Sequence, residues 1–240
     1  MAAKLIVGNW KMNGLRADSK ERVEKLKAAE ATDAYDMVLC PPATLVAQVA
    51  GFTVGTAIAV GGQDCHAEAS GAFTGNISAT MLKDIGCSYV IVGHSERRQL
   101  HGETDETVLA KAKAAHAAGL IAIICIGETD DERTAGQANS VVRKQLAGSV
   151  PQGATAENTV IAYEPVWAIG TGKVASVDDI TAMHAVIREE AKFKARILYG
   201  GSVKGANAKE ILHIPNVDGV LVGGASLKAD EFQAIASASK

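Results

Sequence analysis

The stretch IAIICIGE (121–128) places six consecutive apolar residues before a glycine and a glutamate. An apolar run of this length indicates a strand that is buried on both faces, as in a parallel sheet. The same form recurs along the chain in LIVGNW (5–10), MVLCPP (37–42), IAVGGQ (58–63), YVIVGHS (89–95), VIAYEP (160–165), RILYGG (196–201) and GVLVGGAS (219–226). The sequence therefore predicts eight buried parallel strands.

Stretches rich in Ala, Lys and Glu with helical period separate these runs. We expect helices over 18–31, 104–118, 131–148, 177–194 and 227–238, with shorter ones near 44–50, 79–86 and 206–212. Eightfold alternation without a linker predicts the α/β class, with one (β/α)8 barrel over residues 1–240 around a parallel eight-stranded core. A doubly wound open sheet is the alternative, but no shift in composition marks a second domain.

Bulk composition excludes several classes of protein. The 240 residues carry a net charge of −3 and no basic stripe, which argues against a nucleic-acid partner. No segment approaches the ~18 apolar residues that span a membrane, and the N-terminus lacks a signal sequence, so we expect a cytoplasmic protein. The four cysteines are far apart without a C-x-x-C pair, so neither a zinc site nor a disulfide framework is indicated.

Polar or glycine residues gather at the C-terminal ends of the predicted strands, at Asn9, Gln63, His94, Glu128, Glu164, Ser202 and the pair Gly223-Gly224. In a parallel barrel these ends meet at one face, where such barrels hold their active sites. Packing of apolar side chains does not by itself explain why most of the predicted strands have such residues at their C-terminal ends. The sequence therefore predicts a catalytic site at this face.

Three of the residues near these ends could carry chemistry. Glu164 precedes Pro165, which stops the strand, and apolar neighbours are expected to raise the pKa of this carboxyl and strengthen it as a base. His94 precedes an expected helix start, which disfavours the charged ring and suits a neutral hydrogen-bond donor. Lys11 could supply positive charge to an anionic substrate. Taken singly, each residue could instead be structural or simply exposed.

Glycine-rich segments follow the last two predicted strands, in GGS (200–202) and VGGAS (222–226). Loops at these positions are the usual phosphate site of the barrel, although the glycines could serve only as tight turns. The segment GTGKVA (170–175) matches a dinucleotide fingerprint formally, but five residues separate it from its strand and the expected acidic residue is missing. We therefore favour a phosphate-bearing substrate over a dinucleotide.

Seven segments resemble the motifs of the triosephosphate isomerase family, in order and over essentially the whole chain. They are GNWKMN, GHSERR, HGETDE, CIGET, AYEPVWAIGTG, YGGSVK and DGVLVGGASL. The resemblance implies reversible conversion of dihydroxyacetone phosphate and D-glyceraldehyde 3-phosphate through an enediolate, a step of glycolysis and gluconeogenesis that uses no cofactor and no metal. Another phosphate-binding barrel enzyme, an aldolase or a sugar-phosphate epimerase, is the alternative.

The same resemblance assigns roles to individual residues. It implies that Glu164 is the base, His94 the neutral electrophile and Lys11 the stabilising cation, with Asn9 bonding the substrate and Glu96 supporting His94. The implied phosphate-binding residues are Gly170, Ser202, Gly223 and Gly224, beside Asn9 and Lys11. A lid with an apolar wall is implied at Pro165, Val166, Trp167, Ala168, Ile169, Gly170, Thr171, Gly172, Lys173 and Leu221.

The family resemblance also implies a homodimer in which the loop 66–78 enters the partner's site. Its tip is expected at Phe73, Thr74, Gly75 and Asn76. The family commonly has Glu at the position of Asn76, where it pairs with an arginine across the interface, here expected to be Arg97. Without that carboxylate the ion pair is not expected to form.

Overall fold

The computed structural model describes residues 3–28, 33–169 and 174–240. Its strands form a closed barrel in chain order, in which neighbouring strands run parallel and the last pairs with the first. The strands are β1 (Lys4–Asn9), β2 (Tyr35–Cys40), β3 (Ile58–Gly62), β4 (Tyr89–Val92), β5 (Ile121–Ile126), β6 (Thr159–Tyr163), β7 (Arg196–Tyr199) and β8 (Gly219–Val222). The predicted parallel barrel is therefore confirmed.

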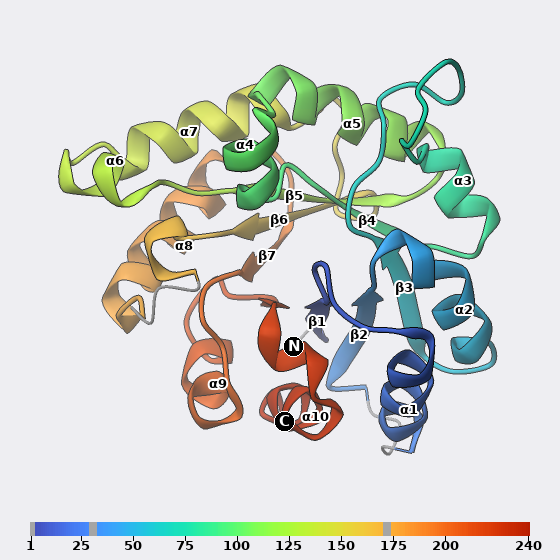
Figure 1. The fold of residues 1–240 in the computed structure, drawn as a ribbon. Helices are drawn as coiled ribbons and strands as arrows, with labels where there is room; N and C mark the ends of the chain where they lie inside the picture. The colour runs from blue at the N-terminus through green and yellow to red at the C-terminus, as the bar shows by residue number, and fades with distance from the viewer. Residues whose placement is uncertain (1–2, 29–32, 170–173) are drawn as a thin grey trace.

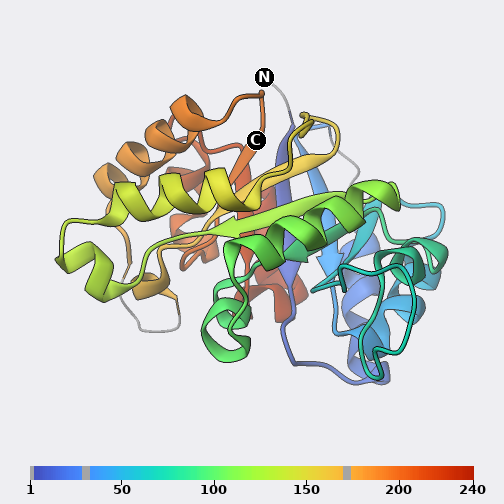
Figure 2. The same ribbon diagram turned by 90° about the horizontal axis from the view of Figure 1, so that it is seen from above.

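Helices surround the strands on the outside (Figures 1 and 2). They are α1 (Arg16–Lys27), α2 (Ala43–Thr53), α3 (Ala79–Asp84), α4 (Ser95–His101), α5 (Asp105–Ala117), α6 (Asp130–Thr134), α7 (Ala138–Ser149), α8 (Val177–Glu190), α9 (Gly205–Leu212) and α10 (Ala229–Ser237). Two short 3₁₀ turns, η1 (Val166–Ala168) and η2 (Gly224–Leu227), follow β6 and β8. Both turns lie at the strand ends that the sequence marks as functional.

One expected helix, 131–148, is divided into two. Helix α6 ends at Thr134 and α7 begins at Ala138. Between them Gly136 has a φ of 72°, a left-handed conformation that glycine adopts readily and that stops a helix. The prediction of one continuous helix was wrong because the helical period of the side chains continues across this break.

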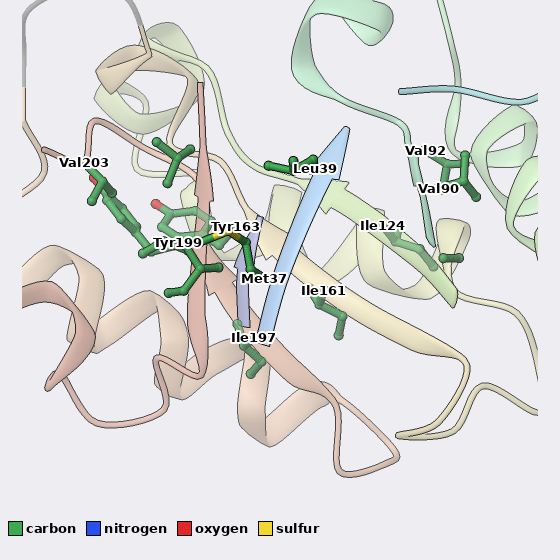
Figure 3. Packing of buried hydrophobic residues seen from close by; sticks show 14 of the residues in the cluster. Met37, Leu39, Val90, Val92, Ile124, Ile161, Tyr163, Ile197, Tyr199 and Val203 are labelled. Atoms are coloured by element: carbon green, nitrogen blue, oxygen red, sulfur yellow. The ribbon is translucent and has the colours of Figure 1, made fainter. Parts of the chain in front are cut away.

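Alternate residues of each strand belong to two separate apolar clusters, which explains the continuous apolar runs. Leu5 and Val7 of β1 lie in the cluster inside the barrel, together with residues such as Ile123 and Cys125 of β5. The remaining strand residues belong to a second cluster, which also contains residues of the helices. Figure 3 shows part of this cluster, with Met37, Leu39, Val90, Val92, Ile124, Ile161, Tyr163, Ile197 and Tyr199 from the strands and Val203 from the segment after β7. Both faces of the sheet are therefore apolar, and polar residues remain only at strand ends.

Within the part of the chain that the structure describes, none of the helices has the length and apolar character needed to cross a membrane.

Candidate active site

A cavity of about 310 Å³ opens at the C-terminal ends of the strands. Nine of the residues that the sequence predicts for the site lie in its wall, namely Asn9, Lys11, His94, Glu164, Ile169, Ser202, Leu221, Gly223 and Gly224. Glu96 lies outside this wall, and the expected lid residues Gly170, Thr171, Gly172 and Lys173 fall outside the described residues. Residues from five strand ends thus meet in one space.

Glu164 projects into the cavity directly after β6 and is almost completely buried. Its backbone N–H donates to the carbonyl of Ile126 at 2.7 Å, so the pairing of β6 with β5 continues one residue beyond the end of β6. Two glycines make room for it: a Cβ on Gly127 would lie 1.7 Å from the Glu164 carbonyl oxygen, and one on Gly200 would lie 2.9 Å from its Cγ. Sequence reasoning missed these two spacing residues.

The Glu164 carboxylate is turned toward His94 and the start of α4. Its Oε1 lies 2.9 Å from Nε2 of His94, and its Oε2 accepts the backbone N–H of Ser95 at 2.9 Å. Both partners come from the segment that follows β4, two strands away in the barrel. The contact therefore depends on the closed sheet and not on neighbouring positions in the sequence.

The ring of His94 has a defined tautomer because it caps α4. Its Nδ1 accepts the backbone N–H of Glu96 at 3.2 Å, so this nitrogen carries no proton. The proton of the neutral ring then lies on Nε2, which faces Glu164 in the cavity. The start of α4 therefore orients the ring so that Nε2 faces the carboxylate of Glu164.

The two buried groups shift each other's pKa. Burial raises the pKa of Glu164, but the His94 ring, the Ser95 N–H and the Lys11 charge together lower it below its ordinary value. Burial lowers the pKa of His94, and the adjacent Glu164 carboxylate outweighs this effect and raises it. The expectation of a raised Glu164 pKa is wrong for this arrangement, because the sequence does not show where the carboxylate points.

Lys11 is held in an unusual backbone conformation, with a φ of 52°. Its N–H donates to Oδ1 of Asn9 at 3.0 Å, and its carbonyl accepts Nε2 of Gln63 at 2.9 Å. Its ammonium group contacts the carboxylate of Glu96. A left-handed conformation costs free energy for a residue other than glycine, and such residues are common at functional sites. The contacts with the side chains of Asn9 and Gln63 hold the Lys11 backbone in this conformation.

The segment after Glu164 begins as a tight turn that is anchored to the body of the barrel. The N–H of Val166 donates to the carbonyl of Glu128 at 3.1 Å, and the indole Nε1 of Trp167 donates to the Glu128 carboxylate at 2.8 Å. Arg133 stacks over the Trp167 ring at 4.4 Å. Sequence reasoning noted Glu128 only as a polar strand end, and its part in anchoring the turn was not foreseen.

The glycine-rich segments after β7 and β8 line the cavity with Gly200, Gly201, Ser202, Gly223 and Gly224. The hydroxyl of Ser202 donates to the carbonyl of Ala168 at 2.9 Å, so this loop touches the expected lid. A Cβ on Gly223 would lie 3.3 Å from Cε of Lys11, while one on Gly224 would meet no atom. The space beside Gly224 is therefore open to a ligand, whereas Gly223 faces the side chain of Lys11.

The loop 66–78 extends away from the barrel, as the long thin segment before α3 in Figure 1. The rings of His66 and Phe73 lie 4.1 Å apart, which folds the loop on itself. Phe73, Thr74, Gly75 and Asn76 are all exposed. Beside the loop a second cavity of about 720 Å³ is lined by residues that include Met12, Asn76, Arg97 and Leu100.

Arg97, the expected partner of a carboxylate across a dimer interface, is bound within its own chain. Its Nε lies 3.0 Å from Oδ2 of Asp64 and also contacts the Glu103 carboxylate. Local sequence pattern does not indicate these two partners, which lie 33 residues before and 6 residues after Arg97.

Comparison with known proteins identifies the family. The family model described as "Triosephosphate isomerase" matches residues 4–239. The chain is 60% identical to the triosephosphate isomerase of Afipia carboxidovorans, covering 98% of this chain and 96% of that protein. It is 56% identical to the triosephosphate isomerase of Ruegeria sp., with 99% and 98% coverage.

A solved structure agrees with these sequence matches. The crystal structure of triosephosphate isomerase from Bartonella henselae superposes with a TM-score of 0.92, at 45% identity and 98% coverage of both chains. The expected family is thus confirmed, and an aldolase or an epimerase is not favoured. The chain belongs to the triosephosphate isomerase family of isomerases.

Proposed function

We propose that Glu164 and His94 carry out the proton transfers that interconvert dihydroxyacetone phosphate and D-glyceraldehyde 3-phosphate, with Lys11 stabilising the charge that develops. The observation that carries this proposal is the contact of 2.9 Å between a buried carboxylate and the Nε2 of a helix-capping histidine, in a cavity that Lys11 also lines. A base, a neutral hydrogen-bond donor and a cation at one cavity are the groups that enolisation requires.

The proposed reaction conserves its protons. The Glu164 carboxylate removes a proton from C1 of dihydroxyacetone phosphate, and the electron pair moves onto the C2 oxygen to form the enediolate. The Nε2–H of His94 and the Lys11 ammonium stabilise that oxygen. The O1 proton passes to O2, and Glu164 returns its proton to C2, which gives D-glyceraldehyde 3-phosphate.

Catalysis in this scheme needs a small movement of the base. In the structure Oε1 of Glu164 is occupied by His94 and Oε2 by the N–H of Ser95. To reach a substrate carbon the carboxylate must release these contacts. Once it turns away, burial and the nearby Lys11 both act to lower the pKa of His94, and the Glu96 N–H keeps Nδ1 unprotonated, so the ring acts as a neutral donor.

The phosphate of the substrate is proposed to bind the backbone at Ser202, Gly223 and Gly224, which line the cavity, together with Gly170. Asn9 and Lys11 complete the contacts to the substrate. The lid is proposed to run from Pro165 through Val166, Trp167, Ala168 and Ile169 to Lys173. Closing it over the cavity would exclude water from an enediolate that otherwise eliminates phosphate. Ile169 and Leu221 both line the cavity, which supports their role as facing apolar walls.

We also propose that the chain works as a homodimer through the loop 66–78. Phe73 is 41% exposed at the loop tip, and the exposed residues Met12 and Leu100 line the cavity beside that loop. Large exposed apolar side chains around one hollow are typical of a surface that another molecule covers. A second copy offers both the apolar tip and the hollow that accepts it. One domain over residues 1–240 and a cytoplasmic location remain predictions from the sequence.

The test is a coupled isomerase assay that starts from D-glyceraldehyde 3-phosphate and is run with and without a chelator. We expect substrate turnover to be the same in both conditions, because none of the proposed steps uses a metal. Absence of turnover by the intact chain would overturn the proposal, and loss of turnover only in the chelator would favour a metal-dependent barrel enzyme.

A further inference from the structure

A cluster of four charged side chains lies beneath the Lys11 and His94 loops. The ammonium of Lys111, on α5, lies 2.7 and 2.9 Å from the two carboxylate oxygens of Asp64 and also contacts Glu103. Arg97, on α4, contacts the same two carboxylates. Lys111 and the Glu103 side chain are almost fully buried, whereas the side chains of Asp64 and Arg97 remain partly exposed. Two positive and two negative charges make the cluster neutral. None of its members enters the proposed chemistry.

Asp64 joins two segments that hold the reacting groups. It directly follows Gln63, whose amide donates to the carbonyls of Lys11 and Cys40 at 2.9 and 2.8 Å and so holds the strained Lys11 backbone. Its carboxylate binds Arg97, whose N–H donates to the carbonyl of His94 at 2.8 Å. Through these two connections Asp64 links the loop of the cation to the helix start that orients the ring.

We propose that Asp64 is a positioning residue that fixes the spacing between Lys11 and His94, an inference that rests on the proposed function. The contacts of Asp64 with Lys111 and Arg97 fix the end of β3 against α4 and α5. Misplacement of catalytic groups by about 1 Å is enough to lower turnover substantially. The phosphate is proposed to bind loops after β7 and β8, which the cluster does not touch, so turnover is expected to suffer more than substrate affinity.

The test compares Asp64→Asn, Lys111→Met and the double variant Asp64→Asn/Lys111→Met, with Asp36→Asn as control. Asp36 also pairs with an arginine, Arg196, at 2.7 Å, but it is exposed at the start of β2, the end of the barrel opposite the cavity. For Asp64→Asn we expect kcat to fall about tenfold with KM changed less than about threefold. The double variant removes one charge of each sign, so its urea midpoint is expected to return toward that of the wild type while its kcat stays low.

Two results would overturn this inference. One is a kcat for Asp64→Asn equal to that of the Asp36→Asn control. The other is a double variant that recovers kcat together with stability, because Asp64 would then serve only to balance the Lys111 charge. All rates are measured at protein concentrations where specific activity is constant, so that dissociation of subunits does not affect them. A loss of kcat that disappears under this condition would also count against a positioning role for Asp64. An inactive wild type would contradict the proposed function itself, whereas an active wild type with an unchanged Asp64→Asn variant contradicts only this inference.

Discussion

The Nε2 atom of His94 lies 2.9 Å from Oε1 of Glu164, and both side chains are almost completely buried. Each therefore determines the protonation of the other: the carboxylate raises the pKa of the ring, and the ring lowers the pKa of the carboxylate. The base is thus kept ionised before substrate arrives, although burial alone would favour its neutral form. Catalysis then depends on where the carboxylate moves, and on how accurately it is placed.

Shortening the base by one methylene group is expected to separate turnover from binding. Glu164→Asp withdraws the carboxylate from the substrate carbon without removing its charge, so we expect kcat to fall by about 100-fold or more and KM to change only a few-fold. Steady-state kinetics in the isomerase assay measure both constants. Glu157→Asp, at an exposed position, is the control. Near-normal turnover by Glu164→Asp would rule out this residue as the base.

Replacing the cavity lysine is expected to damage both constants. Lys11→Met removes a positive charge that is proposed to contact the substrate in the ground state and in the enediolate, so KM should rise and kcat should fall, with kcat/KM lower by at least about 100-fold. Lys204 also lines the cavity but is exposed, and Lys204→Met is the matched control. Equal losses in the two variants would show that general positive charge matters, rather than the fixed position of Lys11.

Acid is expected to destabilise the protein through His184, which is fully buried on α8. Its Nδ1 lies 3.1 Å from the carbonyl of Asn216, Nε2 has no hydrogen-bond partner in the described structure, and burial lowers the ring's pKa to about 4. The unfolded chain binds a proton on this ring below its ordinary pKa of about 6.5, whereas the folded protein does not until about pH 4. The contribution of His184 to the free energy of unfolding is therefore fully present above pH 6.5. It decreases as the pH falls from there to about 4, by on the order of 3 kcal/mol.

Urea unfolding at pH 7, 6, 5 and 4.5, at one protein concentration, measures this loss. His184→Asn keeps a donor for the Asn216 carbonyl but cannot be protonated. We expect it to be less stable than the wild type at pH 7, because a smaller side chain leaves a cavity, and to lose less stability on acidification. His213→Asn, at an exposed position, is the control and should keep the slope of the wild type. Parallel curves for wild type and His184→Asn would contradict the assignment.

Charging the tip of the loop 66–78 is expected to weaken self-association. Sedimentation at micromolar concentration should show the wild type as a dimer and Phe73→Asp shifted toward monomer, because the tip is proposed to be buried in a partner. Val54→Asp changes an equally apolar side chain that is 80% exposed outside this region and should leave the dimer intact. A wild-type monomer with full activity would refute the role given to the loop.

Much of the barrel could be predicted from local pattern. Runs such as 121–126 are apolar at every position because one set of side chains fills the barrel and the alternate set meets the helices. Polar residues are confined to the strand ends, so the sequence alone assigns Asn9, His94 and Glu164 to one face. The break at Gly136 was missed because a single glycine inside a periodic segment does not by itself end a helix.

Contacts between distant segments could not be predicted in this way. The direction of the Glu164 carboxylate, and with it the sign of its pKa shift, depends on Ser95 and His94, which the sequence places about 70 residues earlier. The partners of Arg97 within the chain, Asp64 and Glu103, were likewise not predicted. Glu128 became an anchor for Trp167 only because β5 and β6 are neighbours in the barrel.

Local hydrophobic pattern is enough to predict the barrel, the face that holds the site and the residue types gathered there, because strand burial and strand order follow from that pattern. Which atoms meet depends on the folded chain: Nε2 of His94 contacts the base, Gln63 binds the Lys11 backbone, and Asp64 binds Lys111 and Arg97. Hydrogen bonds and charge interactions act over a few ångströms, and closure of the sheet brings within that range side chains that the chain itself keeps far apart.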